Sequence, residues 1–150
     1  MSAAPSRRFP LGPLALALVA ACSHATTAGQ GDVIVTPDGR RVITENAIER
    51  SGAHTAWDAL QRTVPFFTFN ENSRGKPGRV EHRGRSSIIL RDQPMIVMDG
   101  VELTDFAVLG GMPASDLFEI EVLTGIDATT FYGTGATKGV IRIWTKLSQS

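Results

Sequence analysis

Residues 95–103 read Met-Ile-Val-Met-Asp-Gly-Val-Glu-Leu and hold the strongest short-range hairpin signal in the chain. Asp99-Gly100 separates two short apolar runs, and this dipeptide favours a two-residue turn because both of its positions accept positive φ. The segment therefore predicts two antiparallel strands, Met95–Met98 and Val101–Leu103, joined by a tight turn.

Short elements continue on both sides of this hairpin. On the C-terminal side we expect a helical turn from Pro113 to about Phe118, a strand over Glu119–Leu123, a helix around Asp127–Phe131 and a strand over Val140–Trp144. On the N-terminal side we expect a hairpin of Val33–Thr36 and Arg41–Thr44 around the turn Pro37-Asp38-Gly39. A helix over Ala53–Thr63, a strand over Phe66–Phe69 and a loop over Asn70–Gly78 are expected to follow it. Val80–Arg83 and Ser87–Leu90 have strand character on either side of Gly84. The pattern predicts a small α+β domain.

Particular residues in these elements have expected structural roles. Thr55 and Asp58 are a candidate capping pair for the helix. Glu119 and Glu121 alternate with Ile120 and Val122 in the predicted strand, and Glu121 is expected to be a surface residue. Tyr132 is expected to bury its ring while its hydroxyl stays hydrogen-bonded. Four glycines are expected to supply unusual backbone angles or close packing: Gly125, Gly133, Gly135 and Gly139.

The N-terminus has the features of a secretory signal. Arg7 and Arg8 precede an apolar stretch from Leu11 to Ala21, about half of the ~20 residues that a membrane-spanning helix needs. Val19-Ala20-Ala21-Cys22 resembles the bacterial lipobox, in which the cysteine receives a lipid. We expect a signal peptide over 1–21, lipid attachment at Cys22, a tether over 22–31 and a folded domain over 32–150; the alternative is an ordinary signal peptide cut after Ala21 or near Ala25.

Composition excludes several classes of function. The formal net charge is zero, so the chain lacks the basic character of nucleic-acid-binding proteins. Cys22 is the single cysteine, and the three histidines have no metal-ligand spacing. The glycine-rich stretch 133–139 lacks the ending of a phosphate loop, Ser86-Ser87 lacks a nucleophile-elbow context, and Asp99 with Glu121 is better explained by a turn and a surface residue than by a catalytic pair. We expect no enzyme activity, no metal and no cofactor.

Several blocks, in order along the chain, resemble the plug domain of TonB-dependent outer-membrane receptors. The first blocks are 43–52, read as the opening strand and turn, and Trp57-Asp58-Ala59-Leu60 with Val64-Pro65. The later blocks are Arg83-Gly84, Pro94 with 96–101, Ile120-Glu121-Val122-Leu123, Gly125, Ala128, Tyr132-Gly133, Ala136, Gly139-Val140-Ile141, Ile143 and Thr145-Lys146. The match is most similar to the receptor subgroup that imports oligosaccharides and other polymers. It implies a plug-like fold, a small mixed sheet with short helices, in which Gly84, Pro94, Asp99, Gly100, Glu121, Gly125, Tyr132, Gly133 and Gly139 specify the structure.

The resemblance also implies partners. A receptor plug fills a barrel of about 22 strands, whereas only 147–150 follow Lys146, so we expect no barrel in this chain. Asp32-Val33-Ile34-Val35-Thr36 resembles a TonB box, the strand that pairs with TonB; the simpler interpretation is the first strand of the hairpin. Arg83 is either a docking residue for a barrel supplied by another chain or the partner of Glu119 or Glu121 in a local salt bridge.

The leading hypothesis is a non-enzymatic lipoprotein of the outer membrane that faces the periplasm. It assists or regulates TonB-dependent uptake by binding a barrel, TonB or the imported ligand. Two alternatives stay open: a plug fold reused as a structural or interaction module for an unrelated envelope partner, and the remnant of a truncated receptor.

Overall fold

The computed structural model describes residues 32–83 and 93–150. The strands are β1 (Val33–Val35), β2 (Arg41–Thr44), β3 (Phe67–Glu71), β4 (Pro77–His82), β5 (Met95–Met98), β6 (Val101–Glu102), β7 (Leu117–Leu123) and β8 (Val140–Thr145). The α-helices are α1 (Glu45–Arg50), α2 (Ala56–Thr63), α3 (Ala107–Gly111) and α4 (Gly125–Tyr132), and three short 3-10 helices are η1 (Ala114–Asp116), η2 (Gly133–Ala136) and η3 (Lys146–Gln149). The α+β class expected from the sequence is confirmed.

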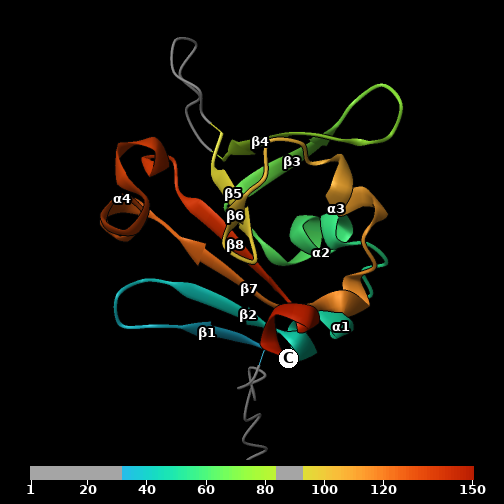
Figure 1. Ribbon diagram of the computed structural model, residues 1–150, viewed down its shortest axis with the longest axis horizontal. Helices are drawn as coiled ribbons and strands as arrows, with labels where there is room; N and C mark the ends of the chain where they lie inside the picture. Colours follow the sequence, from blue (N-terminus) through green and yellow to red (C-terminus); the bar gives the residue numbers. More distant parts are fainter. Residues whose placement is uncertain (1–31, 84–92) are drawn as a thin grey trace, which may run out of the picture.

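A mixed six-stranded sheet organises the domain (Figure 1), with the strand order β1-β2-β7-β8-β5-β6. All neighbouring pairs are antiparallel except β5 and β8, which run parallel with Ile96 opposite Ile141. The N-terminal hairpin therefore lies at one edge of the sheet, and the hairpin around Asp99-Gly100 at the other. β3 and β4 form a separate two-stranded sheet.

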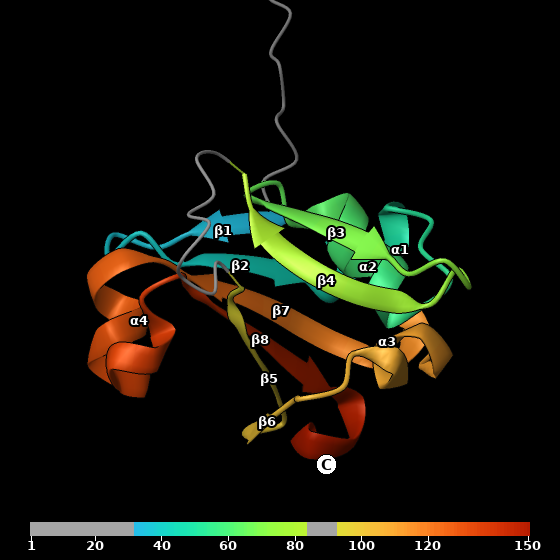
Figure 2. The ribbon, with the colours of Figure 1, turned by 90° about the horizontal axis from the view of Figure 1, so that it is seen from above.

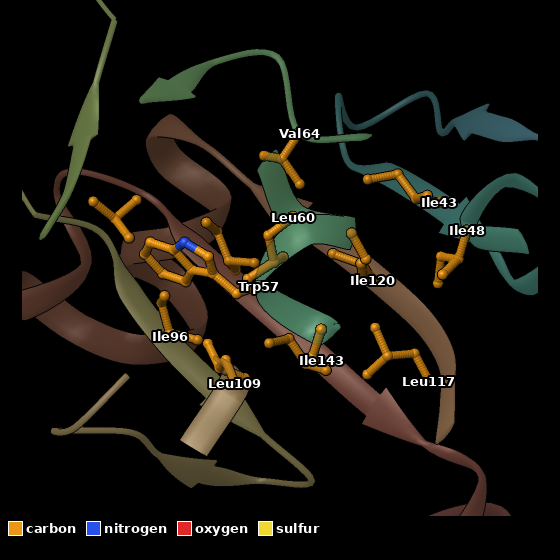
Figure 3. Packing of buried hydrophobic residues seen from close by; sticks show 14 of the residues in the cluster. Ile43, Ile48, Trp57, Leu60, Val64, Ile96, Leu109, Leu117, Ile120 and Ile143 are labelled. Carbon is orange, nitrogen blue, oxygen red and sulfur yellow. The ribbon is translucent and has the colours of Figure 1, made fainter. Parts of the chain in front are cut away.

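One face of the sheet, here named the core face, carries most of the apolar core. Figure 2 shows α2 and the β3–β4 hairpin on this side of the sheet. Ile43, Ile120 and Ile143 project from three strands into one buried cluster, which also takes Trp57 and Leu60 of α2 (Figure 3). Leu60 is fully buried, and its burial stabilises the domain by about 2 kcal/mol relative to an exposed leucine.

The opposite face, here named the α4 face, has a smaller apolar cluster at one end. Val97, Leu123 and Val140 project from the sheet against Ala128 of α4 and Ala136 of η2. Figure 2 shows α4 on the side of the sheet opposite to α2. Since α4 is short, it covers only part of this face.

Gly139, the residue before β8, lies where a side chain would not fit. Its φ is +96°, and a Cβ there would lie 3.0 Å from the carbonyl oxygen of Leu123 and 3.3 Å from Phe67 Cζ. A side chain would therefore meet both an unfavourable backbone conformation and a close neighbour. The expected unusual angles are also confirmed for Gly125 and Gly133, whereas Gly135 has no positive φ.

The N-terminal predictions are confirmed with two changes. β1 and β2 form the expected hairpin. α2 begins at Ala56 instead of Ala53, because Thr55 is its N-cap and accepts a hydrogen bond from the Asp58 amide. Residues 45–50, which the sequence assigned to a strand and turn, form helix α1.

The middle of the chain differs from the expectation in length. The predicted loop over residues 70–78 is shorter, because β3 continues to Glu71 and β4 begins at Pro77. Helix α3 was not expected at all. The predicted strand Ser87–Leu90 and the signature residue Gly84 lie outside the described residues.

Candidate functional site: an open sheet edge and a charged sheet face

The outer edge of β1 has no partner strand among the residues that the structure describes. All three residues of this strand are exposed: Val33 by 41%, Ile34 by 51% and Val35 by 60%. Apolar side chains on an uncovered edge strand are typical of a site where another chain can pair. The two flanking residues of the TonB-box-like segment, Asp32 and Thr36, bond to β2 and its turn instead.

The hydrogen-bond pattern of β1 decides which backbone groups remain open. The Thr36 amide donates to the Arg40 carbonyl at 2.9 Å, and the Thr44 amide donates to the Asp32 carbonyl at 3.1 Å. Because bonded pairs alternate in an antiparallel ladder, Ile34 bonds to Val42, whereas Val33 and Val35 point their N–H and C=O groups outward. The edge thus presents a short set of donors and acceptors for a further strand.

A buried glutamate organises the uncovered part of the α4 face. Glu121 Oε1 lies 3.1 Å from Arg40 Nη1, and its Oε2 lies 2.8 Å from Arg142 Nη1. Glu121 is only 5% exposed, so its prediction as a surface residue is wrong. The physical reason is that Arg40 and Arg142 pair with both carboxylate oxygens, which allows the charge to be buried.

Glu119 and Trp144 extend this charged group along the same face. Burial, together with the negative charge of Glu121, raises the pKa of Glu119, and Arg142 opposes the rise. The Arg142 guanidinium lies 4.8 Å from the centre of the Trp144 ring, a cation–π contact. The face is therefore polar and aromatic where α4 does not cover it.

Helix α4 exposes two large apolar side chains. Ile126 is 82% exposed and Phe131 is 65% exposed. Two large apolar side chains on one short helix are unusual for a surface that faces only water. Together with the β1 edge and the charged group, they mark surfaces suited to contact another molecule.

Asp99 fastens the second hairpin to the end of β8. Its carboxylate accepts hydrogen bonds from the amide and the hydroxyl of Thr145, both at 2.8 Å. Burial raises the pKa of Asp99, but the bonds from Thr145 and Ser148 outweigh that effect and hold the pKa below its usual value. The predicted turn is confirmed, with positive φ at Asp99 (49°) and Gly100 (85°). The hydrogen bonds between the Asp99 carboxylate and Thr145 were not predicted from the sequence.

Arg83 is exposed and follows β4, outside the six-stranded sheet. Within residues 32–83 and 93–150, no ion pair joins Arg83 to Glu119 or Glu121, and Glu121 pairs with other arginines. The local salt bridge is therefore not formed. Docking to a barrel stays a prediction.

The remaining signature residues have structural positions. Pro94 is buried before β5, Gly125 begins α4, and Gly133 follows it. Tyr132 is half-buried and its ring packs against the smaller apolar cluster as expected, but its hydroxyl has no hydrogen-bond partner within residues 32–83 and 93–150. Cys22 lies outside the described residues, and the signature residues within 32–83 and 93–150 form no catalytic arrangement.

Residues 32–83 and 93–150 contain neither a candidate metal site nor a helix that could span a membrane. No group of three or more His, Cys, Asp or Glu residues there has the geometry to hold a metal ion. In the same residues, no helix has the length and apolar character required to cross a membrane.

The model of the TonB-dependent Receptor Plug Domain family matches residues 32–140. The chain belongs to this family. The match begins at Asp32, the residue before β1, and includes all six strands of the main sheet at least in part.

Similar curated proteins are TonB-dependent receptors. This chain is 30% identical to the ferric aerobactin receptor of Klebsiella pneumoniae, and the match covers 94% of this chain. It is 34% identical to the TonB-dependent receptor SusC of Bacteroides thetaiotaomicron, and that match covers 51% of this chain. The chain spans 20% of the first receptor and 8% of the second. One relative is a ferric aerobactin receptor and another is SusC. The similar proteins therefore do not single out the expected receptor subgroup, the one that imports oligosaccharides and other polymers.

Solved structures share the fold. The plug chain superposes on the RagAB peptide importer with a TM-score of 0.56 and 26% identity, covering 71% of this chain and 12% of that one. For the ferric enterobactin receptor of Pseudomonas aeruginosa, the TM-score is 0.52 and the identity 25%, over 75% of this chain and 18% of that one.

Proposed function

We propose that this plug domain is the working part of a non-enzymatic lipoprotein of the outer membrane that faces the periplasm. It assists or regulates TonB-dependent uptake by binding a barrel, TonB or the imported ligand. The observation that carries the proposal is the plug match over residues 32–140 together with an apolar β1 edge that no described strand covers.

The membrane anchor is the lipid at Cys22. Its support is the lipobox-like Val19-Ala20-Ala21-Cys22 after an apolar segment of signal-peptide length. A diacylglycerol adds about 0.8 kcal/mol of membrane affinity for each buried CH₂, so a multiply acylated terminus holds the domain at a membrane stably. Radiolabelled palmitate is expected to enter the chain and to be lost in Cys22→Ser; incorporation that persists in the variant contradicts the anchor.

TonB would bind at the β1 edge. Val33 and Val35 offer outward backbone groups, and a partner strand that pairs with them extends the sheet by β-augmentation. The confirmed hairpin is compatible with this pairing, since it occupies only the inner edge of β1.

The exposed surfaces other than the β1 edge would contact the wall of a barrel. Arg83 is an exposed cation, the Arg40–Glu121–Arg142 group is charged, and Ile126 with Phe131 is apolar. An interface of this composition has the apolar anchors and charged contacts that specific protein surfaces use.

Photocrosslinking in intact cells tests the proposal. A benzophenone amino acid in place of Ile34 reports on partners of the β1 edge, and the same probe in place of exposed Arg74, in the β3–β4 turn, is the matched control. The expected result is an adduct with TonB or an outer-membrane transporter at position 34 and not at 74. Adducts at position 34 only with envelope proteins unrelated to TonB or barrels contradict the proposal and favour a reused interaction module.

A further inference from the structure

A hollow of about 200 Å³ opens on the core face, beyond the end of the apolar cluster. It lies where the β1–β2 hairpin approaches β3–β4 and the end of β7. Its walls include Val35, Arg41, Phe66, His82, Val122 and Thr124, and no lining residue is acidic. The hollow is separate from the charged group of the α4 face, because Arg41 and Val122 oppose each other on the other side of the sheet.

Arg41 differs from the other half-buried arginines. Arg40 and Arg142 share the carboxylate of Glu121, but Arg41 makes no ion pair with any carboxylate of residues 32–83 and 93–150. Its guanidinium lies 4.7 Å from the centre of the Phe66 ring, which fixes its orientation. A partly desolvated guanidinium without an acidic partner is compensated when an anion binds beside it.

Two more polar groups line the same hollow. His82 uses Nδ1 toward the Arg83 carbonyl at 2.9 Å, and its other ring nitrogen has no hydrogen-bond partner among the described residues. Thr124 lines the hollow and is exposed, and its side chain does not cap the start of α4. The hollow thus combines one cation and polar groups with the apolar walls of Val35 and Val122.

We infer that this hollow binds a small organic carboxylate, whose oxygens pair with the Arg41 guanidinium and whose apolar part packs against Val35, Val122 and the Phe66 ring. A planar guanidinium matches a carboxylate through two parallel hydrogen bonds, and the contact with the Phe66 ring restricts the movement of the Arg41 guanidinium. Val35 belongs both to this hollow and to the β1 edge, but the inference does not rest on the proposed function, because this chain alone supplies every wall of the hollow.

Isothermal titration of the full chain with sodium benzoate tests the inference, with sodium chloride at equal ionic strength as the blank. Saturable binding is expected. Arg41→Gln is expected to weaken it by about tenfold or more, because charge-assisted hydrogen bonds are lost. Arg74→Gln removes the same charge from an exposed turn and is expected to leave the binding unchanged.

A second variant keeps the test decisive if Arg41→Gln unfolds. Val35→Phe adds bulk at a side chain that is 60% exposed, so the fold is retained while the hollow is narrowed. Benzoate binding is expected to weaken in this variant too. No saturable binding to the natural chain, equal binding in the folded variants, or tighter binding of inorganic phosphate than of benzoate overturns the inference.

Discussion

The two faces of one sheet differ although they are built from alternate residues of the same strands. On the core face, β7 and β8 contribute Ile120, Val122, Ile141 and Ile143, all at most 1% exposed. On the α4 face, Glu121 and Arg142 lie between these residues and Trp144 follows them, and an apolar cluster lies only at one end of this face. The difference shows that the core face supplies most of the apolar burial that stabilises the fold, while the α4 face holds paired charges and an aromatic ring.

The largest expected effect is a truncation on the core face. Leu60→Ala removes a fully buried side chain and leaves a cavity, so the free energy of unfolding is expected to fall by about 2–5 kcal/mol. Urea denaturation followed by circular dichroism measures it. Ile34→Ala, at a side chain that is 51% exposed, is the control and is expected to cost about 0.5 kcal/mol or less.

Glu121→Gln is expected to have an intermediate effect, a loss of about 1–3 kcal/mol. The cost is below that of breaking a fully buried pair, because the Arg40 and Arg142 side chains are 33% and 26% exposed and can hydrate. Glu81→Gln breaks the exposed pair with Arg79 and is expected to change stability by at most about 0.5 kcal/mol. Equal effects of the two variants would contradict a buried charged group.

Asp99→Asn is expected to cost about 1 kcal/mol at pH 7. Asparagine tolerates the positive φ of the turn, so the variant tests the hydrogen bonds that the Asp99 carboxylate accepts from Thr145. Since the folded pKa of Asp99 is lowered, its contribution is complete above the unfolded pKa of about 3.9 and is lost as pH falls through the folded value. The stability difference between the natural chain and the variant should therefore shrink below about pH 4; a constant difference from pH 7 to pH 3 would show that the carboxylate is not the cause.

The smallest effect on stability is expected on the exposed side of α4. Ile126→Ser changes a side chain that is 82% exposed, so the free energy of unfolding should stay within about 0.5 kcal/mol. Crosslinking of the domain to a barrel partner should nevertheless decrease if this surface docks. An unchanged crosslink yield removes Ile126 from the proposed interface.

Local signals in the sequence predicted the elements that local chemistry determines. Asp99-Gly100 and Pro37-Asp38-Gly39 both form the expected hairpins, and Thr55 caps α2. Helix α1 was missed because it is only six residues long and buries one side chain, Ile48, which gives no helical periodicity. Helix α3 has five residues and ends in two glycines, so its sequence carries little helical propensity.

The charged group could not be predicted because its members meet only in the folded sheet. Arg40 is 81 residues from Glu121 in sequence, and the alternation in β7 indicates a side of the strand but not what lies opposite. The sole hint was Arg142 between two isoleucines of the last strand. The free edge of β1 depends likewise on the strand order, which periodicity does not provide.

Amide hydrogen exchange at β1, with and without the periplasmic domain of TonB, tests the open edge most directly. In the free protein the Val33 and Val35 amides should exchange fast and the Ile34 amide slowly, because only Ile34 bonds to β2. Addition of saturating TonB domain should slow exchange at Val33 and Val35. Protection of these two amides in the free protein, or no change when TonB is added, would contradict the account.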